Sequence, residues 1–286
     1  MGLPWRPDMY TKPNVSEKLL RQLLGDDEKE IESILLHKDE DRLFIAVPQA
    51  DGTNCYIPRI CANRTFVYRL LQEDDRKAFD SIYEDFYFHR HNDFWASEAM
   101  KRLPALVEAT GMLCCAEDLG MVPSCVGPVM QALGILSLEI QTMPKEFGIR
   151  FARLENNPYR SVATIFTHDM PTLRMWWEEN AGRSQEYYNQ ILQIDGRAPK
   201  QMPGWLCKEV IARHLFSPSM LCLISLQDWL AMDEELRAAD PMKERINIPA
   251  DPQHYWRYRM HLDIEQLMDA ADFNNNVREM IERSGR

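Results

Sequence analysis

The sequence predicts an α/β protein whose strands run parallel and are covered by helices, and three observations support this fold class. Short apolar runs alternate with longer amphipathic stretches over the second half of the chain. Two of these runs end in acidic residues, as strands do when they deliver polar side chains to one edge of a parallel sheet. With 286 residues, of which 45% are hydrophobic, the chain can also bury a sizeable core.

The charge and the cysteines limit the possible partners and the cellular compartment. A formal net charge of −11 argues against nucleic acid and anionic membranes as partners, because both require clustered Lys and Arg. No apolar stretch approaches the roughly 18 residues of a membrane span, and the N-terminus lacks an apolar signal segment. Seven irregularly spaced cysteines favour free thiols in a reducing compartment over disulfides or a zinc site. We therefore expect a cytoplasmic protein without a metal.

The first part of the chain predicts short helices and irregular structure. Three prolines make residues 1–13 irregular, and apolar residues at helical spacing in 15–43 predict two short helices, broken at Gly25-Asp26-Asp27. Leu43–Val47 is a candidate strand, and Asp51-Gly52 indicates a turn.

A long amphipathic helix is predicted from about residue 80 to residue 109, within a mostly helical stretch that starts near residue 64. Pro104 could kink this helix. Its candidate core positions are the large apolar residues Phe86, Phe88, Phe94, Trp95, Met100, Leu103 and Leu106.

The rest of the chain, after about residue 110, alternates strands and helices. The predicted strands are Met112–Ala116, Leu136–Gln141, Ser161–Thr167 and Met220–Leu226. The predicted helices are 123–133, 172–181, 184–193, 205–215 and a terminal helix over 260–283.

Four parallel strands are half of the number in an eight-stranded barrel, and a half barrel leaves two unpaired edges. The chain is therefore a fragment, a partner of another polypeptide, or an open sheet covered by residues 1–110.

Glu117 and Asp118 follow the first predicted strand, where a carboxylate at a sheet edge can act as a general acid and base. Alternatively, Asp118 interacts with the N-terminus of a following helix. His168 and Asp169 follow the third strand, where they could contact sugar hydroxyls and stabilise positive charge at an anomeric carbon. Asp169 also precedes Pro171, which is a normal arrangement for a helix cap.

The last predicted strand is followed by Gln227 and Asp228, which form either a sugar-binding rim or another helix cap. The segments Arg245–Pro249 and Tyr255–Arg259 are rich in aromatic residues and Arg. They could stack on sugar rings, but packing against the terminal helix is the favoured interpretation. Trp176-Trp177 is interpreted as core.

Taken together, these segments resemble a known family. Ala116–Gly120, Thr167–Asp169, Trp176–Glu178, Gln227-Asp228, Arg245–Pro249 and Trp256–Arg259 occur in this order in the 4-alpha-glucanotransferases, the amylomaltases or disproportionating enzymes of glycoside hydrolase family 77. Three further segments resemble the subgroup of the plant cytosolic enzyme and its bacterial relatives: Pro123–Val126, Ser219-Met220 and His254–Arg259. The resemblance covers roughly residues 75–286.

The resemblance implies the C-terminal half of a (β/α)8 barrel with a terminal helix over residues 81–286, preceded by a mostly helical or irregular insertion over residues 1–80. It implies transfer of alpha-1,4-linked glucosyl units between maltose, maltooligosaccharides and glycogen- or starch-like glucans, without a cofactor, by a retaining double displacement. Glu117 would be the acid/base and Asp169 the transition-state stabiliser. The implied substrate-binding residues are His168, Asp118, Gln227 and Asp228.

The family's nucleophile lies in an Arg-x-Asp-His motif on an earlier strand, and this sequence contains no such motif. Arg6-Pro7-Asp8 lacks the following His and an apolar strand before it. We therefore expect a chain that is inactive alone and that needs the missing half of the barrel or self-association through exposed sheet edges. The alternatives are a non-catalytic glucan-binding remnant and one half of a split enzyme.

Overall fold

The computed structural model describes residues 16–25, 27–36, 41–120 and 122–286, and it divides into two compact units. Unit 1 contains residues 1–101 and 123–125, and unit 2 contains residues 102–122 and 126–286. The division falls inside helix α5 (His91–Glu108). The irregular segment that the sequence predicts for residues 1–13 lies outside the described residues, as does Asp26.

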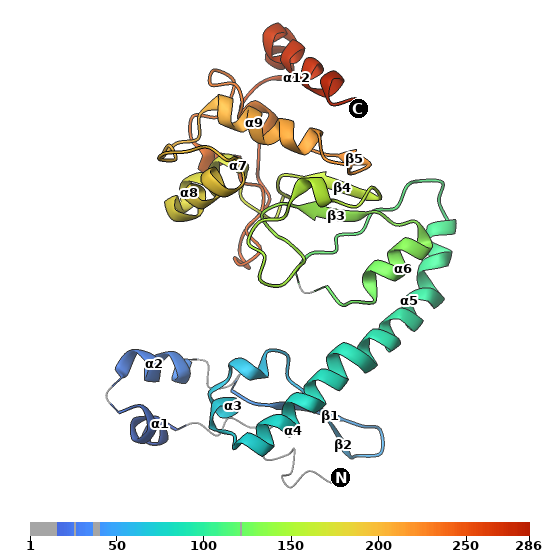
Figure 1. The fold of residues 1–286 in the computed structure, drawn as a ribbon, viewed down its shortest axis with the longest axis vertical. Helices are drawn as coiled ribbons and strands as arrows, with labels where there is room; N and C mark the ends of the chain where they lie inside the picture. Colours follow the sequence, from blue (N-terminus) through green and yellow to red (C-terminus); the bar gives the residue numbers. More distant parts are fainter. Residues whose placement is uncertain (1–15, 26, 37–40, 121) are drawn as a thin grey trace. The chain divides into compact units, whose positions relative to one another are not determined.

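Unit 1 begins with the two predicted short helices, α1 (Glu17–Leu24) and α2 (Glu28–Leu36), drawn in dark blue in Figure 1. The Ser16 side chain caps α1 by accepting a hydrogen bond from the Leu19 N–H. Gly25 ends the helix with a φ of 64°, a conformation that glycine adopts without strain. The predicted break between the two helices is therefore confirmed.

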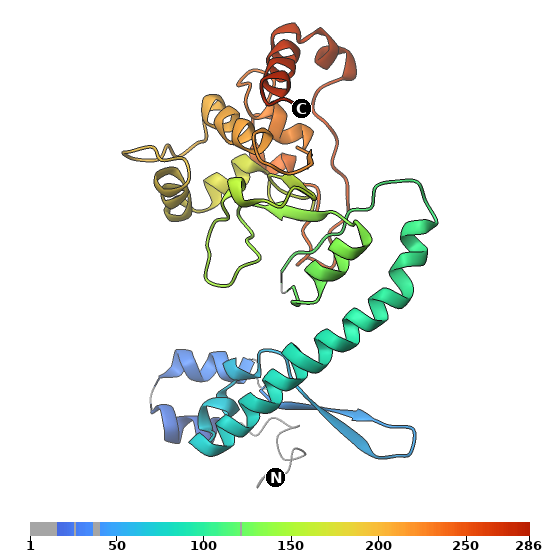
Figure 2. The same cartoon turned by 45° about the vertical axis from the view of Figure 1, so that its right-hand side comes forward.

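A hairpin of β1 (Phe44–Pro48) and β2 (Asn54–Pro58) follows, and its antiparallel register pairs Phe44 with Pro58. The predicted first strand and the Asp51-Gly52 turn are confirmed, since Gly52 has a φ of 81°. Figure 2 shows the turn pointing away from α1 and α2. The sequence did not predict β2, because its Asn-Cys-Tyr-Ile-Pro composition lacks a clear apolar alternation.

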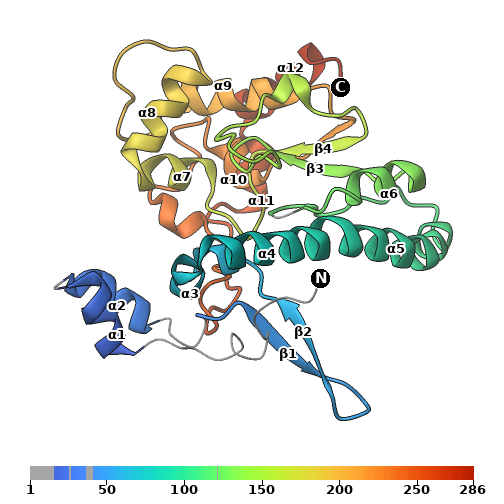
Figure 3. The ribbon, with the colours of Figure 1, turned by 60° about the horizontal axis from the view of Figure 1, so that its bottom comes forward.

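Helices α3 (Phe66–Leu70) and α4 (Glu73–Glu84) lead into a π-helical turn, η4 (Asp85–Arg90), and then into α5. The backbone is helical without interruption from residue 73 to residue 108, past Pro104, as Figure 3 shows. The 3-10 turn η3 (Ala62–Arg64) precedes α3.

The core positions predicted for this long helix are wrong, because no residue of η4 or α5 is buried. Phe94 and Trp95 are exposed although adjacent residues can share one apolar stripe of a helix, so the spacing alone did not decide their burial. Aromatic rings contact one another instead, as in the stacked His91 and Trp95 rings. The exposed members of the predicted set are Phe88, Phe94, Trp95, Met100 and Leu106.

Unit 2 is an α/β structure built on three parallel strands in the order β3 (Ser137–Ile140), β4 (Ser161–Thr164) and β5 (Leu221–Cys222). The parallel arrangement confirms the predicted fold class. Met112–Ala116, predicted as a fourth strand, forms only one parallel bridge, from Cys115 to Leu136. This segment therefore lies along β3 without forming a full strand.

Seven α-helices of unit 2 pack around these strands or follow them: α6 (Val126–Leu133), α7 (Leu173–Glu179), α8 (Ala181–Gln190), α9 (Gly204–Leu215), α10 (Leu226–Leu230), α11 (Ile264–Asp269) and α12 (Ala271–Arg283). Two 3-10 turns, η5 (Leu154–Asn156) and η6 (Pro241–Glu244), lie in the connections. The terminal helix predicted over 260–283 is interrupted at Ala270, whose ψ of 66° is not helical.

The main core lies between the strands and α7, α8, α9 and α12. All four residues of β4 are buried, and Trp176 and Trp177 belong to this core, as predicted. The seven cysteines, all of them within the described residues, are free thiols. Among the described helices, none combines the length and the apolar composition that crossing a bilayer would require.

Candidate active site

Four of the predicted site residues follow two parallel segments of the unit 2 sheet that lie on either side of β3. The acids Glu117 and Asp118 follow the Cys115 bridge, and His168 and Asp169 follow β4. Because neighbouring strands in this sheet run parallel, their carboxyl ends lie at the same edge. The topology therefore brings both acid-bearing segments to one edge, as the sequence predicted.

At the first segment, Glu117 is exposed, whereas Asp118 is bound to its neighbours. Asp118 Oδ1 accepts a hydrogen bond of 2.8 Å from the Leu138 N–H of β3, and Oδ2 lies 2.7 Å from Lys145 Nζ. Lys145 Nζ also lies 2.8 Å from Glu139 Oε1. Asp118 therefore links the acidic turn to β3, and both of its carboxylate oxygens already have partners.

At the second segment, Asp169 has one carboxylate oxygen in a network of side chains. The Asn247 side-chain amide donates to Asp169 Oδ1 at 2.5 Å, and His168 Nε2 lies 3.6 Å from the same oxygen. The Asp169 and His168 side chains keep 37% and 48% of their surface exposed. The His168 ring also lies 5.1 Å from the ring of Trp256. The pair is thus positioned by its neighbours but open to a ligand.

Helix capping, the alternative interpretation of Asp169, is not observed. The residue that precedes α7 is Thr172, and the Leu173 N–H at the start of that helix donates to Asp228. Asp169 is therefore not needed to begin the helix.

Asn247 is a site residue that sequence reasoning missed. Its backbone N–H donates to the His168 carbonyl at 3.1 Å, while its side chain contacts Asp169. Arg245 Nε in turn donates to the Asn247 carbonyl at 2.9 Å. The only sequence signal for Asn247 is the Arg245–Pro249 segment, for which packing is the favoured interpretation.

The packing predicted for Tyr255 and Trp256 is wrong, because these two residues are 69% and 56% exposed. Neither residue belongs to the core that contacts α12. Trp256 lies beside His168 instead, so a flat aromatic surface is available next to the open face of the site.

Gln227 and Asp228 lie behind this open face and are buried, with 8% and 1% of their surface exposed. Asp228 Oδ1 accepts from the Leu173 N–H at 2.8 Å, and Oδ2 accepts from the Ser225 hydroxyl at 2.9 Å. Burial raises the pKa of Asp228 to about 6. Ser225 caps α10, so Asp228 joins the starts of two helices rather than capping its own.

A buried network continues behind Asp228. Arg174 Nη1 lies 2.9 Å from Glu244 Oε1, and the Thr172 hydroxyl donates to Glu244 Oε2 at 2.8 Å. Burial raises the pKa of Glu244, although the bonds from Thr172 and Arg174 oppose that change. Because Glu244 directly precedes the Arg245–Pro249 segment, this network fixes the segment that carries Asn247.

His168, Gln227 and Asp228 line one cavity of about 130 Å³ below the site. The structure therefore brings the segments Thr167–Asp169, Gln227-Asp228 and Arg245–Pro249 together around a single cavity, beside the exposed pair His168 and Asp169. Such an arrangement can donate hydrogen bonds to hydroxyl groups and place negative charge beside a developing cation.

The family model and the curated relatives that match this chain all carry the same description. A family model described as 4-alpha-glucanotransferase matches residues 37–264. The rice protein 4-alpha-glucanotransferase DPE2 is 32% identical over 282 residues, which cover 96% of this chain and 30% of the rice protein. The 4-alpha-glucanotransferase of Chlamydia muridarum is 28% identical over 176 residues, covering 60% of this chain and 33% of that protein.

Among solved structures, amylomaltase from Streptococcus agalactiae in complex with acarbose is 16% identical, with a TM-score of 0.47. The match covers 87% of this chain and 52% of that chain. The chain spans about a third of the length of the two curated relatives.

Proposed function

The chain belongs to the 4-alpha-glucanotransferase family, and from this premise we propose that it supplies the acid/base half of a glucan-transferring active site. The observation that carries the proposal is the parallel sheet, which delivers Glu117 and the His168–Asp169 pair to one edge. The proposed substrates are maltose, maltooligosaccharides and glycogen- or starch-like glucans, all of them neutral and therefore compatible with a net charge of −11.

In this proposal, Glu117 protonates the oxygen of the leaving sugar and later removes a proton from the acceptor hydroxyl. Its exposed position leaves the carboxylate open to a substrate. Asp169 stabilises the positive charge that develops at the anomeric carbon, since it keeps more than a third of its side-chain surface exposed. His168 contacts a ring hydroxyl beside it.

The three other proposed site residues act behind these groups. Asp118, whose two oxygens are bonded to Leu138 and Lys145, fixes the turn that carries Glu117. Gln227 and Asp228 form the inner wall of the cavity below His168. A substrate hydroxyl that enters this cavity would meet their side chains.

A retaining transfer also needs a carboxylate nucleophile, about 5–5.5 Å from the acid/base. The family motif Arg-x-Asp-His does not occur in these 286 residues. We therefore propose that this chain does not catalyse transfer alone, and that the strands of unit 2 form part of a (β/α)8 barrel completed by another segment. The boundary near residue 80 and the cytoplasmic location stay predictions.

The test combines the chain with a second polypeptide that carries an Arg-x-Asp-His strand from a relative. The chain alone should not disproportionate maltose with glycogen as acceptor, and the combination should. Glu117→Gln should then lower the transfer rate by about 10²–10⁴-fold, the usual contribution of general acid–base catalysis. Robust disproportionation by the unmixed chain would contradict the claim that a nucleophile is missing.

The non-catalytic alternative makes a different prediction for the same materials. A glucan-binding remnant should bind maltooligosaccharides with unchanged affinity when Glu117 and Asp169 are both replaced by amides. Exposed Tyr255 and Trp256 give that alternative a surface, because aromatic rings stack on sugar faces.

A further inference from the structure

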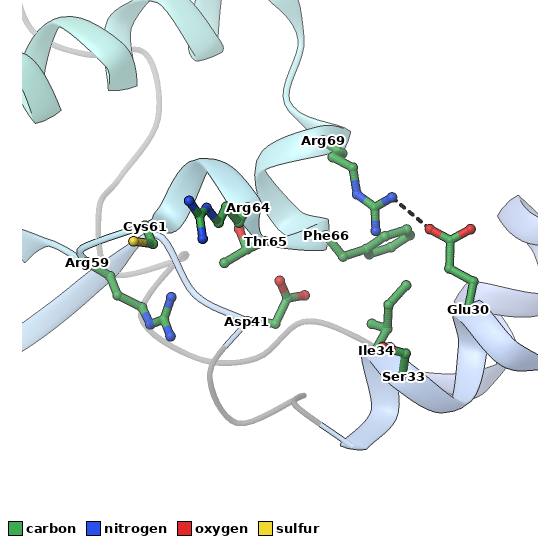
Figure 4. Close-up of a pocket in the computed structure, with 10 residues that line it drawn as sticks. All are labelled: Glu30, Ser33, Ile34, Asp41, Arg59, Cys61, Arg64, Thr65, Phe66 and Arg69. Atoms are coloured by element: carbon green, nitrogen blue, oxygen red, sulfur yellow. Dashed lines mark hydrogen bonds and ion pairs between the residues drawn. The ribbon is translucent and has the colours of Figure 1, made fainter. Parts of the chain in front are cut away.

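A cavity in unit 1 and another in unit 2 lie outside the proposed transfer site, and they differ in the groups that a ligand could reach. The first has a volume of about 380 Å³ and is lined by Asp41, as Figure 4 shows. Oδ1 of Asp41 accepts from the Val67 N–H, and its Oδ2 is closed to solvent. Arg69 and Glu30, which also line this cavity, pair with each other at 2.8 Å. Because its buried carboxylate is out of reach, the unit 1 cavity offers a ligand less than the cavity in unit 2.

The unit 2 cavity has a volume of about 350 Å³, within the range of about 300–1,000 Å³ that small-molecule pockets occupy. Its walls come from Gln141, from η5, from the turn after α8 and from the end of α9. The turn η5 leads into β4 and the end of α9 leads into β5, whereas His168 and Asp169 follow β4. The cavity shares no lining residue with the one below His168, so it is separate from the transfer site.

Hydrogen bonds between the surrounding elements hold the walls of this cavity in place. Gln141 is buried, and its side-chain oxygen accepts from the Tyr187 hydroxyl of α8 at 2.6 Å. Arg213 of α9 donates to the carbonyls of Ile191 and Leu192 at 2.6 and 3.0 Å. These bonds join α8, α9 and the end of β3, so the cavity is formed before a ligand enters it.

The rim of the cavity carries polar groups that a ligand can reach. The Arg153 and Glu155 side chains keep more than half of their surface exposed, and Gln193 is exposed as well. A guanidinium group donates hydrogen bonds, a carboxylate accepts them, and a carboxamide does both. Because a hydroxyl group can donate and accept, these three side chains suit a ligand with several hydroxyls.

An aromatic ring lies on the same rim. Phe216 lines the cavity and is 63% exposed. A single exposed apolar residue is ordinary, but this ring borders polar groups that could hold the edge of a sugar while its face lies on the ring. The backbone of Gln193 adds a further observation, because its φ is 58° although it is not glycine. Such strained conformations concentrate at ligand sites.

The charges around the cavity favour a neutral ligand. Arg213 Nε lies 2.7 Å from Glu209 Oε1, and Arg153 Nη1 lies 3.9 Å from Glu155 Oε1. Each lining guanidinium therefore has a carboxylate beside it. An anion or a cation would approach a like charge together with the unlike one, whereas a neutral polyhydroxyl ligand meets neither penalty.

We propose that this cavity is a second glucan-binding site, separate from the transfer site. The face of one sugar ring lies on Phe216, and its hydroxyls bond to Gln193, Arg153 and Glu155. The lining indicates a neutral sugar, and the choice of an alpha-1,4-linked glucan rests on the proposed function. A second contact on the same chain strengthens the hold on a polymeric glucan, because binding at one point raises the effective concentration at the other.

The experiment titrates the 15N-labelled full chain with maltoheptaose and follows it by NMR. The Gln193 side-chain amide and the Phe216 backbone N–H report on the cavity, and the Trp256 indole N–H reports on the transfer site. We expect saturable shifts of both sets of signals. Because each site has its own reporter, the affinity of each is measured separately.

Phe216→Ala should weaken the binding that Gln193 reports by about tenfold or more and should leave the Trp256 midpoint unchanged. Phe147→Ala is the matched control, because Phe147 is also an exposed phenylalanine of unit 2 but does not line the cavity. Gln193→Gly is a second variant, followed at the Phe216 N–H. Glycine adopts a φ of 58° without strain, so this variant removes the carboxamide and keeps the fold.

Three results would overturn the proposal. These are the absence of saturable shifts at Gln193 and Phe216, an unchanged Gln193 midpoint in Phe216→Ala, and loss of the Gln193 response in Trp256→Ala, which would place the glucan in the transfer site alone. Shifts confined to Trp256 would contradict the second site and leave the proposed function standing. Shifts confined to Gln193 and Phe216 would do the reverse, so the two proposals can fail separately.

Discussion

The two acid-bearing ends of the unit 2 sheet arise from the same sequence pattern but are supported differently. Glu117 follows a segment with a single bridge, in which Met112 and Leu113 are 76% and 54% exposed. Asp169 follows β4, which is buried at all four positions. One partly exposed salt bridge supports the first end, and a buried network supports the second. An apolar run followed by an acid therefore predicts where a carboxylate lies, but not how firmly it is held.

The largest predicted effect is the loss of stability on removing the buried ion pair behind the Asp169 end. Arg174→Met leaves Glu244 buried without its cation, because the Arg174 and Glu244 side chains are only 6% and 3% exposed. Removing one member of a buried pair typically costs about 3–5 kcal/mol. Urea unfolding monitored by tryptophan fluorescence measures the loss in the free energy of unfolding.

Two controls sharpen this result. Arg283→Met removes an exposed pair with Glu279 and should cost less than about 1 kcal/mol. Adding Glu244→Met to Arg174→Met should recover much of the lost stability, since no uncompensated charge remains. An Arg174→Met variant as stable as Arg283→Met would show that the buried pair does not support the Asp169 end.

The next largest effect is a pH dependence of the free energy of unfolding, which arises from Asp228 behind the Asp169 end. Burial raises the pKa of Asp228 to about 6, above its value in an unfolded chain, so its contribution to stability is complete below about pH 4. That contribution falls as the pH rises through 6, by about 3 kcal/mol in total. Asp228→Asn should abolish the fall, as measured by the free energy of unfolding at about pH 4 and pH 7.

The pH dependence of Asp228→Asn must be compared with that of the unmodified chain, because His214 changes stability with pH in the opposite direction. Burial lowers the pKa of His214 from 6.5 to about 4. The free energy of unfolding therefore decreases as the pH falls from about 6.5 toward 4, because the unfolded chain then binds a proton that the folded chain does not. The difference between the two chains removes this shared term. An equal pH dependence in both would contradict a raised pKa for Asp228.

The sequence predicted the fold class because periodicity depends on local spacing. β3, β4 and most helices follow the apolar runs that predicted them. Met112–Ala116 and the core of α5 failed because burial depends on a neighbour that spacing does not reveal. Phe94, Trp95, Met100 and Leu106, which would fill a core, are exposed in α5.

The site was predictable in its placement but not in its supporting contacts. Glu117, His168 and Asp169 could be found because each follows an apolar run. Asn247 lies 78 residues after Asp169, and nothing in the spacing of the two shows that they meet. Asp228 likewise accepts a hydrogen bond from Leu173, 55 residues earlier in the chain, and no sequence pattern shows that contact.

A smaller effect concerns the Glu117 end. Lys145→Met leaves the carboxylates of Asp118 and Glu139, whose side chains are only 9% and 17% exposed, without the cation that they share. Charged hydrogen bonds contribute about 1.5–3 kcal/mol, so we expect a loss of about 2 kcal/mol. Hydrogen exchange at the Leu138 N–H should become faster, because Asp118 accepts that hydrogen.

The matched control for this end is Lys77→Met, which removes an exposed pair with Glu73. It should leave the Leu138 N–H unchanged. If Lys145→Met also left that exchange rate unchanged, the salt bridge would not support the Glu117 turn, and the two ends would differ even more than their contacts suggest.

The smallest effect on stability should accompany a clear effect on catalysis. Asn247→Ala removes the hydrogen bond to Asp169, whose side chain is 37% exposed, so unfolding should change by about 1 kcal/mol or less. In the combined two-chain assay, the transfer rate should nevertheless fall about tenfold, mainly in kcat, because a carboxylate free to rotate stabilises the transition state less well. Asn276→Ala is the control, since Asn276 accepts from Lys208 on the surface, far along the chain from Asp169. A tenfold rise in KM with unchanged kcat would mean that Asn247 binds substrate rather than positioning Asp169. The Asp169 end would then not be the more preorganised of the two ends.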